Sequence, residues 1–139
     1  MQPDAAFFGE KDYQQYLVIK KMTESLKLNT RIICVKTVRD RNGLPLSSRN
    51  SYLSGQEFKI AIKINKLLKK LPPLIRTKLK INKILNHTKK VLIDHGVDKI
   101  DYLTVLNDDL SIRKKINDKS RIFIAAKIGN TRLIDNIKI

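Results

Sequence analysis

Cysteine, tryptophan and glycine are scarce in this sequence. Its 139 residues include one cysteine, no tryptophan and five glycines. A single cysteine excludes an internal disulfide and any metal site built from several cysteines. Cys34 lies in the apolar run 32–35, so we predict that it is a small buried hydrophobic residue.

Long apolar runs and signal-like segments are also missing. No run approaches the roughly 20 residues that a membrane-spanning helix needs. The opening residues, Gln2, Pro3 and Asp4, are polar and turn-like, unlike a signal peptide. The sequence therefore predicts a cytoplasmic location. We find no glycine-rich phosphate loop and no Ser/His/Asp arrangement.

Negative charge is in short supply. The chain has 29 Lys and Arg against 13 Asp and Glu, which gives a formal net charge of +16. This balance is typical of proteins that bind nucleic acid, an anionic membrane or an anionic substrate. However, the lysines are spread through nearly every segment, so compositional drift at surface positions explains much of the excess, and a functional basic face is the alternative. Aromatic residues make up 6% and do not interleave with a basic strip, which argues against a platform for stacked bases.

The first third of the chain predicts a β-α-β unit. Residues 4–9 predict a strand, 12–27 a helix, and 31–38 a second strand buried on both faces. A parallel pair of strands needs neighbouring strands and cover on both faces. We therefore expect this unit to be part of a larger sheet.

The remainder, from about residue 40, predicts a small α+β domain. Ser54 and Glu57 form a capping box that opens a helix, and Pro72 and Pro73 stop it after about Leu71. The other expected elements are a turn at 39–43 marked by Asn42-Gly43, a helix at 74–95, a strand at 99–106 and a short helix from Asp108 and Asp109. Strands at 121–128 and 132–137 are expected to form a hairpin. The sheet is expected to be mostly antiparallel.

The first candidate site is the strand-to-helix turn at 9–15. Gly9 is its pivot, and Asp12 with Gln15 has the spacing of a capping box. Lys11 at a helix start is unfavourable unless an anion is bound there, because the helix dipole is positive at that end. The turn therefore fits a phosphate or carboxylate pocket, although a plain helix cap with Lys11 in water stays open.

The second candidate site is the polar loop around Ser47, Ser48 and Arg49. Two hydroxyls and a guanidinium suit phosphate oxygens, and a polar turn leading to Ser54 is the alternative. Both candidates follow strands whose carboxyl ends share one edge in a parallel sheet, where ligands of such sheets bind. We predict that Lys11 and Arg49 converge on one anion. His87, His95 and the carboxylates of Asp108 and Asp109 are predicted to be structural.

Four segments resemble the pantothenate synthetase (pantoate–β-alanine ligase) family. They are residues 7–15, residues 39–43, residues 46–54, which begin Leu46-Ser47-Ser48-Arg49-Asn50, and the tail 128–136. The resemblance implies an ATP-dependent ligase of the nucleotidylyl-transferase superfamily, with a Rossmann-like domain and a smaller carboxyl-terminal domain. It implies that pantoate attacks the α-phosphorus of ATP to give pantoyl-adenylate and pyrophosphate. The β-alanine amine then displaces AMP to give pantothenate.

The resemblance also implies site residues, which we carry over position by position. Gln15 would bind pantoate, and Lys11, Ser47, Ser48 and Arg49 would be catalytic. The ATP-binding set would be Gly9, Glu10, Lys11, Asp12, Val38, Leu46, Ser47, Ser48 and Arg49. Mg²⁺ is implied through ATP chemistry, and the intact family implies a homodimer.

The part of the family that carries its His-x-Gly-His loop has no counterpart here. We therefore expect residues 1–39 to be the end of the Rossmann-like ATP-binding domain and 40–139 to be a small α+β lid domain. Alone, the chain is expected to make no pantothenate, and its missing half is an expected partner if it exists as a separate chain. A small basic nucleic-acid-binding domain and an inert remnant are the alternative readings.

Overall fold

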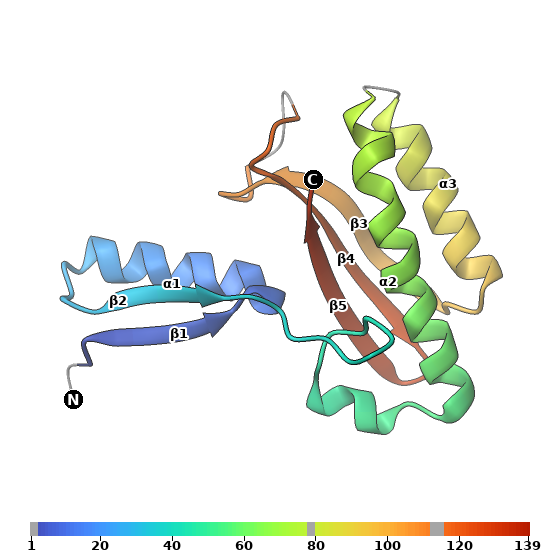
Figure 1. The fold of residues 1–139 in the computed structure, drawn as a ribbon, viewed down its shortest axis with the longest axis horizontal. Helices are drawn as coiled ribbons and strands as arrows, with labels where there is room; N and C mark the ends of the chain where they lie inside the picture. Colours follow the sequence, from blue (N-terminus) through green and yellow to red (C-terminus); the bar gives the residue numbers. More distant parts are fainter. Residues whose placement is uncertain (1–2, 78–79, 112–115) are drawn as a thin grey trace. The chain divides into compact units, whose positions relative to one another are not determined.

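The computed structural model describes residues 3–77, 80–111 and 116–139. The chain divides into two compact units, Met1–Val38 and Arg39–Ile139. Figure 1 shows a strand–helix–strand unit in blue and cyan, followed by a second unit that runs from green to red. The α/β fold class with a parallel pair and an antiparallel sheet is confirmed.

The first unit is the predicted β-α-β arrangement. Strand β1 (Ala5–Gly9) leads through a 3-10 turn, η1 (Glu10–Asp12), into helix α1 (Tyr13–Ser25). Strand β2 (Arg31–Val35) then returns parallel to β1. The register runs from Ala5 opposite Arg31 to Gly9 opposite Val35, so the two strands end level with each other.

The expectation that β2 is buried on both faces is wrong. Both of its end residues are exposed and the residues between them are half-buried, including Cys34. Within the described residues β2 pairs only with β1, and α1 is the helix that packs on this two-stranded sheet, so the strand has too little cover to be buried on both faces. Other apolar side chains of this unit are also exposed, with Phe7 at 66% and Val18 at 56%.

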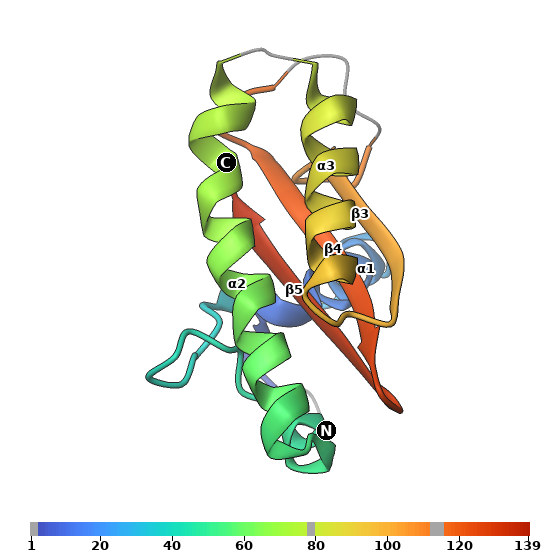
Figure 2. The ribbon, with the colours of Figure 1, turned by 90° about the vertical axis from the view of Figure 1, so that its right-hand side faces the viewer.

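The second unit packs two helices on a three-stranded sheet. After the short η2 (Ser48–Tyr52) come α2 (Gly55–Arg76) and α3 (Ile81–Asp94). Strands β3 (Lys99–Asn107), β4 (Ser120–Ile128) and β5 (Thr131–Lys138) form an antiparallel sheet in the order β3-β4-β5. Figure 2 shows both helices lying over one face of this sheet.

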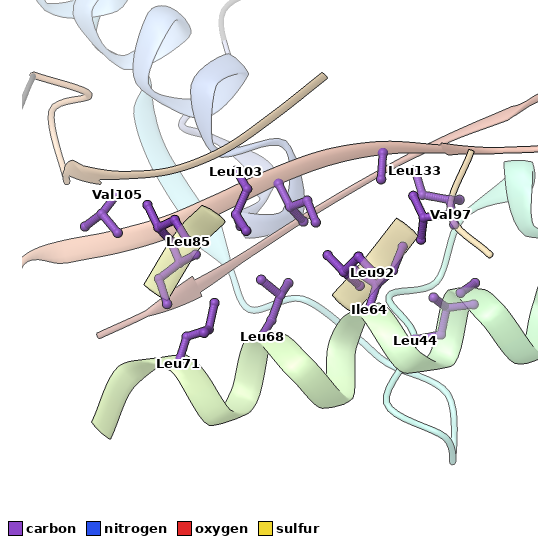
Figure 3. Close-up of a cluster of buried hydrophobic side chains, with 14 of the residues drawn as sticks. Leu44, Ile64, Leu68, Leu71, Leu85, Leu92, Val97, Leu103, Val105 and Leu133 are labelled. Carbon is purple, nitrogen blue, oxygen red and sulfur yellow. The ribbon is translucent and has the colours of Figure 1, made fainter. Parts of the chain in front are cut away.

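The core of the second unit lies between the helices and the sheet (Figure 3). Helix α2 contributes Ile64, Leu68 and Leu71 at helical spacing, and β4 contributes alternate residues such as Ile122 and Ile124. Spacings of 3.6 and 2 residues place these side chains on one face of each element. The unit therefore has a hydrophobic core of its own, which holds its loops in place.

Helix α2 continues through Pro72 and Pro73, so the predicted stop there is wrong. The last turn carries Ile75, which is fully buried in the core. Burying such a side chain contributes about 1.5–3 kcal/mol, which offsets much of the roughly 3 kcal/mol cost of a proline inside a helix. The predicted helix at 74–95 is accordingly shorter and is α3, with residues 78–79 outside the described chain.

Two other local predictions had different outcomes. The capping box of Ser54 and Glu57 is present in both directions. The expected helix start at Asp108 and Asp109 is instead a turn, in which the Leu110 N–H donates to the Asn107 carbonyl. Any helix continuing over 112–115 would lie outside the described residues. Leu110 has a φ of 65°, which breaks a right-handed helix at this point.

Candidate functional site

The carboxyl edge of the first unit gathers the first set of predicted site residues. Gly9 ends β1, and Glu10, Lys11 and Asp12 form the 3-10 turn before α1. The Thr37 N–H donates to Glu10 Oε2 at 3.4 Å, which joins the turn after β1 to the segment after β2. That segment ends at Val38, whose side chain is 63% exposed. The edge thus brings two predicted ATP-binding segments together.

The predicted capping box at the start of α1 is wrong. Asp12 occupies the N-cap position, but its side chain makes no capping hydrogen bond. Its backbone, with φ −94° and ψ 51°, departs from the extended geometry of a capping residue because the 3-10 turn enters the helix directly. Asp12 and Gln15 are both exposed and Lys11 is half-buried. These polar side chains therefore lie at the carboxyl edge of the parallel strands and do not cap α1.

In the second unit, the turn at 39–45 is closed by Asp40. The Asp40 carboxylate accepts hydrogen bonds from the N–H groups of Asn42 and Leu44, at 2.8 and 2.9 Å. Partial desolvation raises the pKa of Asp40, but these hydrogen bonds, led by that from Leu44, hold the pKa below its ordinary value. Arg39 and Pro45 form a β-bridge across the base of the turn.

The predicted phosphate-binding residues, Ser47, Ser48 and Arg49, come directly after this turn in the chain. Ser47 is the N-cap of η2, and its Oγ accepts from the Arg49 N–H at 3.3 Å. The Asn50 side chain donates to the Pro45 carbonyl at 3.0 Å, which ties η2 to the closed turn. Leu46, Ser48 and Arg49 are exposed. The loop thus presents a guanidinium and hydroxyl groups on a hydrogen-bonded base.

A polar network under this turn was missed by the sequence analysis. Arg39 makes two 2.8 Å bonds to the carboxylate of Asp135, and Asn65 on α2 donates to the same carboxylate at 3.2 Å. Asp135 lies at an inward position of β5 between Leu133 and Ile137. A carboxylate at such a position needs a cation. A charged residue at an inward position of the alternating pattern in 133–137 could therefore have indicated a buried ion pair from the sequence.

Gly43 is required where the turn approaches α2. Its φ is +88°, and a Cβ there would lie 2.7 Å from Asn65 Oδ1. Any other residue would be strained and would collide with a buried side chain. The Asn-Gly pair that marks the turn in the sequence thus also permits close packing on α2.

The remaining predicted residues behave structurally in the described chain. His87 is exposed, and His95 is the C-cap of α3, with its Nδ1 2.6 Å from the Val91 carbonyl oxygen. Across residues 3–77, 80–111 and 116–139, no three His, Cys, Asp or Glu side chains gather as metal ligands would. The first set of site residues lies in one unit and the second set in the other. Their convergence stays a prediction.

These features define an α/β protein in which a parallel β-α-β unit precedes a helix-covered antiparallel sheet, with polar turns at the strand ends. The chain belongs to the pantoate-beta-alanine ligase family, whose model matches residues 1–138. This confirms the resemblance seen in the sequence. Within the described parts of the chain, no helix is sufficiently long and apolar to span a bilayer.

Similar proteins cover nearly the whole chain. The pantothenate synthetase of Bradyrhizobium sp. (strain BTAi1) is 41% identical over 140 residues, which is 99% of this chain and 49% of the relative. That of Buchnera aphidicola subsp. Acyrthosiphon pisum is 42% identical over 146 residues, covering 100% and 50%. The chain therefore spans about half the length of the curated relatives it matches.

Solved structures agree. Pantothenate synthetase from Thermus thermophilus matches with a TM-score of 0.89 at 33% identity, covering 99% of this chain and 50% of that one. The pantoate-beta-alanine ligase of Francisella tularensis, complexed with beta-gamma ATP and beta-alanine, matches with a TM-score of 0.72 at 34% identity, covering 99% and 44%. These comparisons lend no support to the alternative of a nucleic-acid-binding domain.

Proposed function

We propose that this chain forms the nucleotide-closing part of an ATP-dependent ligase that joins pantoate to β-alanine. The observation that carries the proposal is the family match over residues 1–138, which includes both predicted site segments. A solved relative is complexed with beta-gamma ATP and beta-alanine, which supports the two substrates. In this proposal, residues 1–39 complete a Rossmann-like ATP-binding domain and 40–139 form a lid domain.

The turn after β1 would hold ATP and pantoate in this proposal. Gly9, Glu10, Lys11 and Asp12 would contact ATP, and the exposed Gln15 side chain would bind pantoate through its amide. The Lys11 ammonium would stabilise negative charge on the phosphates. Glu10 would set the shape of the edge, because its carboxylate accepts the Thr37 N–H.

The stretch of chain that follows β2 would hold the rest of the nucleotide. Val38, the last residue of the first unit, would contact the adenine, and Leu46 in the second unit would contact the nucleotide through its exposed apolar side chain. The Ser47 and Ser48 hydroxyls and the Arg49 guanidinium would donate hydrogen bonds to phosphate oxygens. Donors fixed in advance at the developing charge are the main source of rate in phosphoryl-type transfer.

The proposed reaction has two steps. A pantoate carboxylate oxygen forms a bond to the α-phosphorus as the bond to the β-phosphate oxygen breaks, and pyrophosphate leaves with that electron pair. The β-alanine amine then attacks the acyl carbon of pantoyl-adenylate, the acyl–oxygen bond breaks and AMP leaves. Lys11 and Arg49 would stabilise the first step, in which charge develops on the departing pyrophosphate.

Mg²⁺ would enter this site with the substrate. The ion usually keeps several waters and binds through one or two carboxylates and the substrate phosphates. The carboxylates of Glu10 and Asp12 lie in the same 3-10 turn as Lys11, and Asp12 is exposed and makes no capping bond. This donor set fits a Mg²⁺ that neutralises phosphate charge.

The proposal includes partners. The missing half of the ligase, if it is a separate chain, would pair with an open edge of the β1–β2 sheet, because a two-stranded parallel sheet lacks the neighbours that stabilise it. The homodimer of the intact family and a cytoplasmic location are further parts of the proposal. The chain alone is expected to make no pantothenate.

Incubation of the lone chain with ATP, pantoate and β-alanine tests this last expectation. We expect no pantothenate above a sample without protein, because this chain spans about half the length of its relatives. The matched sample is the complete Buchnera aphidicola enzyme at equal concentration. Robust turnover by the lone chain would contradict the proposal that the missing half of the ligase is needed for activity.

A further inference from the structure

We propose that Asp135 is a positioning residue for the loop at 46–49, acting through Arg39. The inference rests on the proposed function, which makes this loop a phosphate-binding element. Asp135 itself is 6% exposed and lies in β5, 86 or more positions along the chain from the loop residues. Its role is therefore to fix the loop's base.

The carboxylate of Asp135 is fully used. Its Oδ2 accepts from Arg39 Nη1 at 2.8 Å and from Asn65 Nδ2 at 3.2 Å. Its Oδ1 accepts from Arg39 Nη2 at 2.8 Å and from the Asn136 N–H at 2.8 Å. A bidentate pair fixes the plane of a guanidinium as well as its position, so Arg39 is held in one orientation.

Arg39, held in this orientation, restrains the turn at 39–45. Its Nη1 also donates to the Gly43 carbonyl at 3.1 Å, and its backbone bridges to Pro45. The Pro45 carbonyl accepts from the Asn50 side chain at 3.0 Å. Hydrogen bonds to Gly43 and Pro45, joined by the short chain segment 43–45, thus link β5 to the helix η2 that carries Ser48 and Arg49.

Arg39 also occupies a special position in the chain. It directly follows Val38, the proposed adenine contact, and it precedes the proposed phosphate contacts at 46–49. An anchor on this one residue therefore fixes the start of the turn that leads to residues 46–49. The buried Asn65, packed against Gly43, fixes the same turn from α2.

The test compares Asp135→Asn with Asp101→Asn in the full chain. Asp101 is a matched control, because it also pairs with an arginine, Arg132, at 2.7 Å, but on an exposed part of the sheet. We expect Asp135→Asn to speed amide exchange at Asp40, Leu44 and Asn50 by about tenfold or more, since hydrogen bonds to charged groups are worth that factor. Exchange in β4 stays unchanged, and ATP affinity falls by about tenfold.

A second variant, Arg39→Lys, tests the same ion pair in case Asp135→Asn fails to fold. Lysine keeps the positive charge but loses the planar fork, so the same three amides should again exchange faster while β4 does not. The proposal is overturned if loop exchange is unchanged in both variants, or if loop and β4 amides speed up together as in general destabilisation. It is also overturned if Asp101→Asn has the same effect. ATP affinity is measured with the missing half of the Buchnera aphidicola enzyme added. Should that mixture bind no ATP, the proposed function fails, while the exchange comparison still decides the role of Asp135.

Discussion

Arg39 and Asp135 form a two-point ion pair, with both nitrogen–oxygen distances at 2.8 Å. The side chains are largely buried, with 21% and 5% of their surface exposed. The pair joins the first residue of the second unit to its last strand. The candidate phosphate loop is therefore anchored to a largely buried ion pair on β5, although Leu46, Ser48 and Arg49 are exposed.

Removal of the Arg49 guanidinium should weaken ATP binding. We expect Arg49→Ala to lower ATP affinity by about tenfold or more, because a charge-assisted hydrogen bond is worth roughly 1.5–3 kcal/mol. Arg41→Ala is the matched control, since Arg41 is an exposed arginine in the preceding turn. Calorimetric titration with ATP measures both, and an equal loss in the two variants would assign the effect to net charge alone.

Acid should loosen the turn at 39–45 through Asp40. Hydrogen bonds from Leu44 and Asn42 outweigh partial desolvation and place the folded pKa of Asp40 below the ordinary 3.8. A lowered folded pKa stabilises the fold above the unfolded pKa, and this contribution is lost as the pH falls through the folded pKa. The Leu44 amide shift, followed by NMR from pH 6 to about 2, should move only below about pH 4. In Asp40→Asn it should stay flat, and an unchanged titration there would refute this assignment.

Loss of the α2 cap should destabilise the second unit. Ser54 Oγ accepts from the Glu57 N–H, and the Glu57 carboxylate accepts from the Ser54 N–H at 2.7 Å. We expect Ser54→Ala to lower the free energy of unfolding by about 1 kcal/mol. Urea denaturation measures it, with Ser25→Ala at the exposed end of α1 as the control. Equal values for the two variants would show that the cap contributes nothing.

Replacement of a helical proline should stabilise the same unit. Pro73 lies inside α2 and is exposed, so Pro73→Ala adds a backbone donor without disturbing the core. We expect a gain of about 1–2 kcal/mol, because the roughly 3 kcal/mol helix penalty of proline is partly offset by its restriction of the unfolded chain. Thermal unfolding measures it, with Leu74→Ala as a neighbouring exposed control. A loss of stability in Pro73→Ala would contradict this account of α2.

Local sequence patterns were sufficient where residues close together along the chain determine the structure. The Ser54–Glu57 box, the Asn42–Gly43 turn and the hairpin of β4 and β5 were all predicted from short patterns. The parallel pairing of β1 and β2 followed from the helix between them. Each of these depends on residues within one element or one connection.

Non-local packing explains the errors. Pro72 predicted a helix end, but burial of Ile75 against the core carries α2 one turn further. Cys34 was expected to be buried, but within the described residues β2 pairs with one strand only and leaves it half-buried. The Arg39–Asp135 pair joins positions 96 residues apart, and no local pattern links them. In the sequence, only the charged Asp135 among the inward-facing residues of β5 could have indicated this ion pair.

Formation of AMP in a reconstituted mixture tests the central claim most directly. This chain is mixed with the half of the Buchnera aphidicola enzyme that the match leaves out, and AMP is measured after addition of ATP, pantoate and β-alanine. We predict AMP formation that needs both polypeptides and all three substrates and that Arg49→Ala reduces at least about tenfold. Absence of AMP from the mixture, under conditions in which the complete Buchnera enzyme is active, would contradict the claim that this chain supplies the nucleotide-closing part of a ligase.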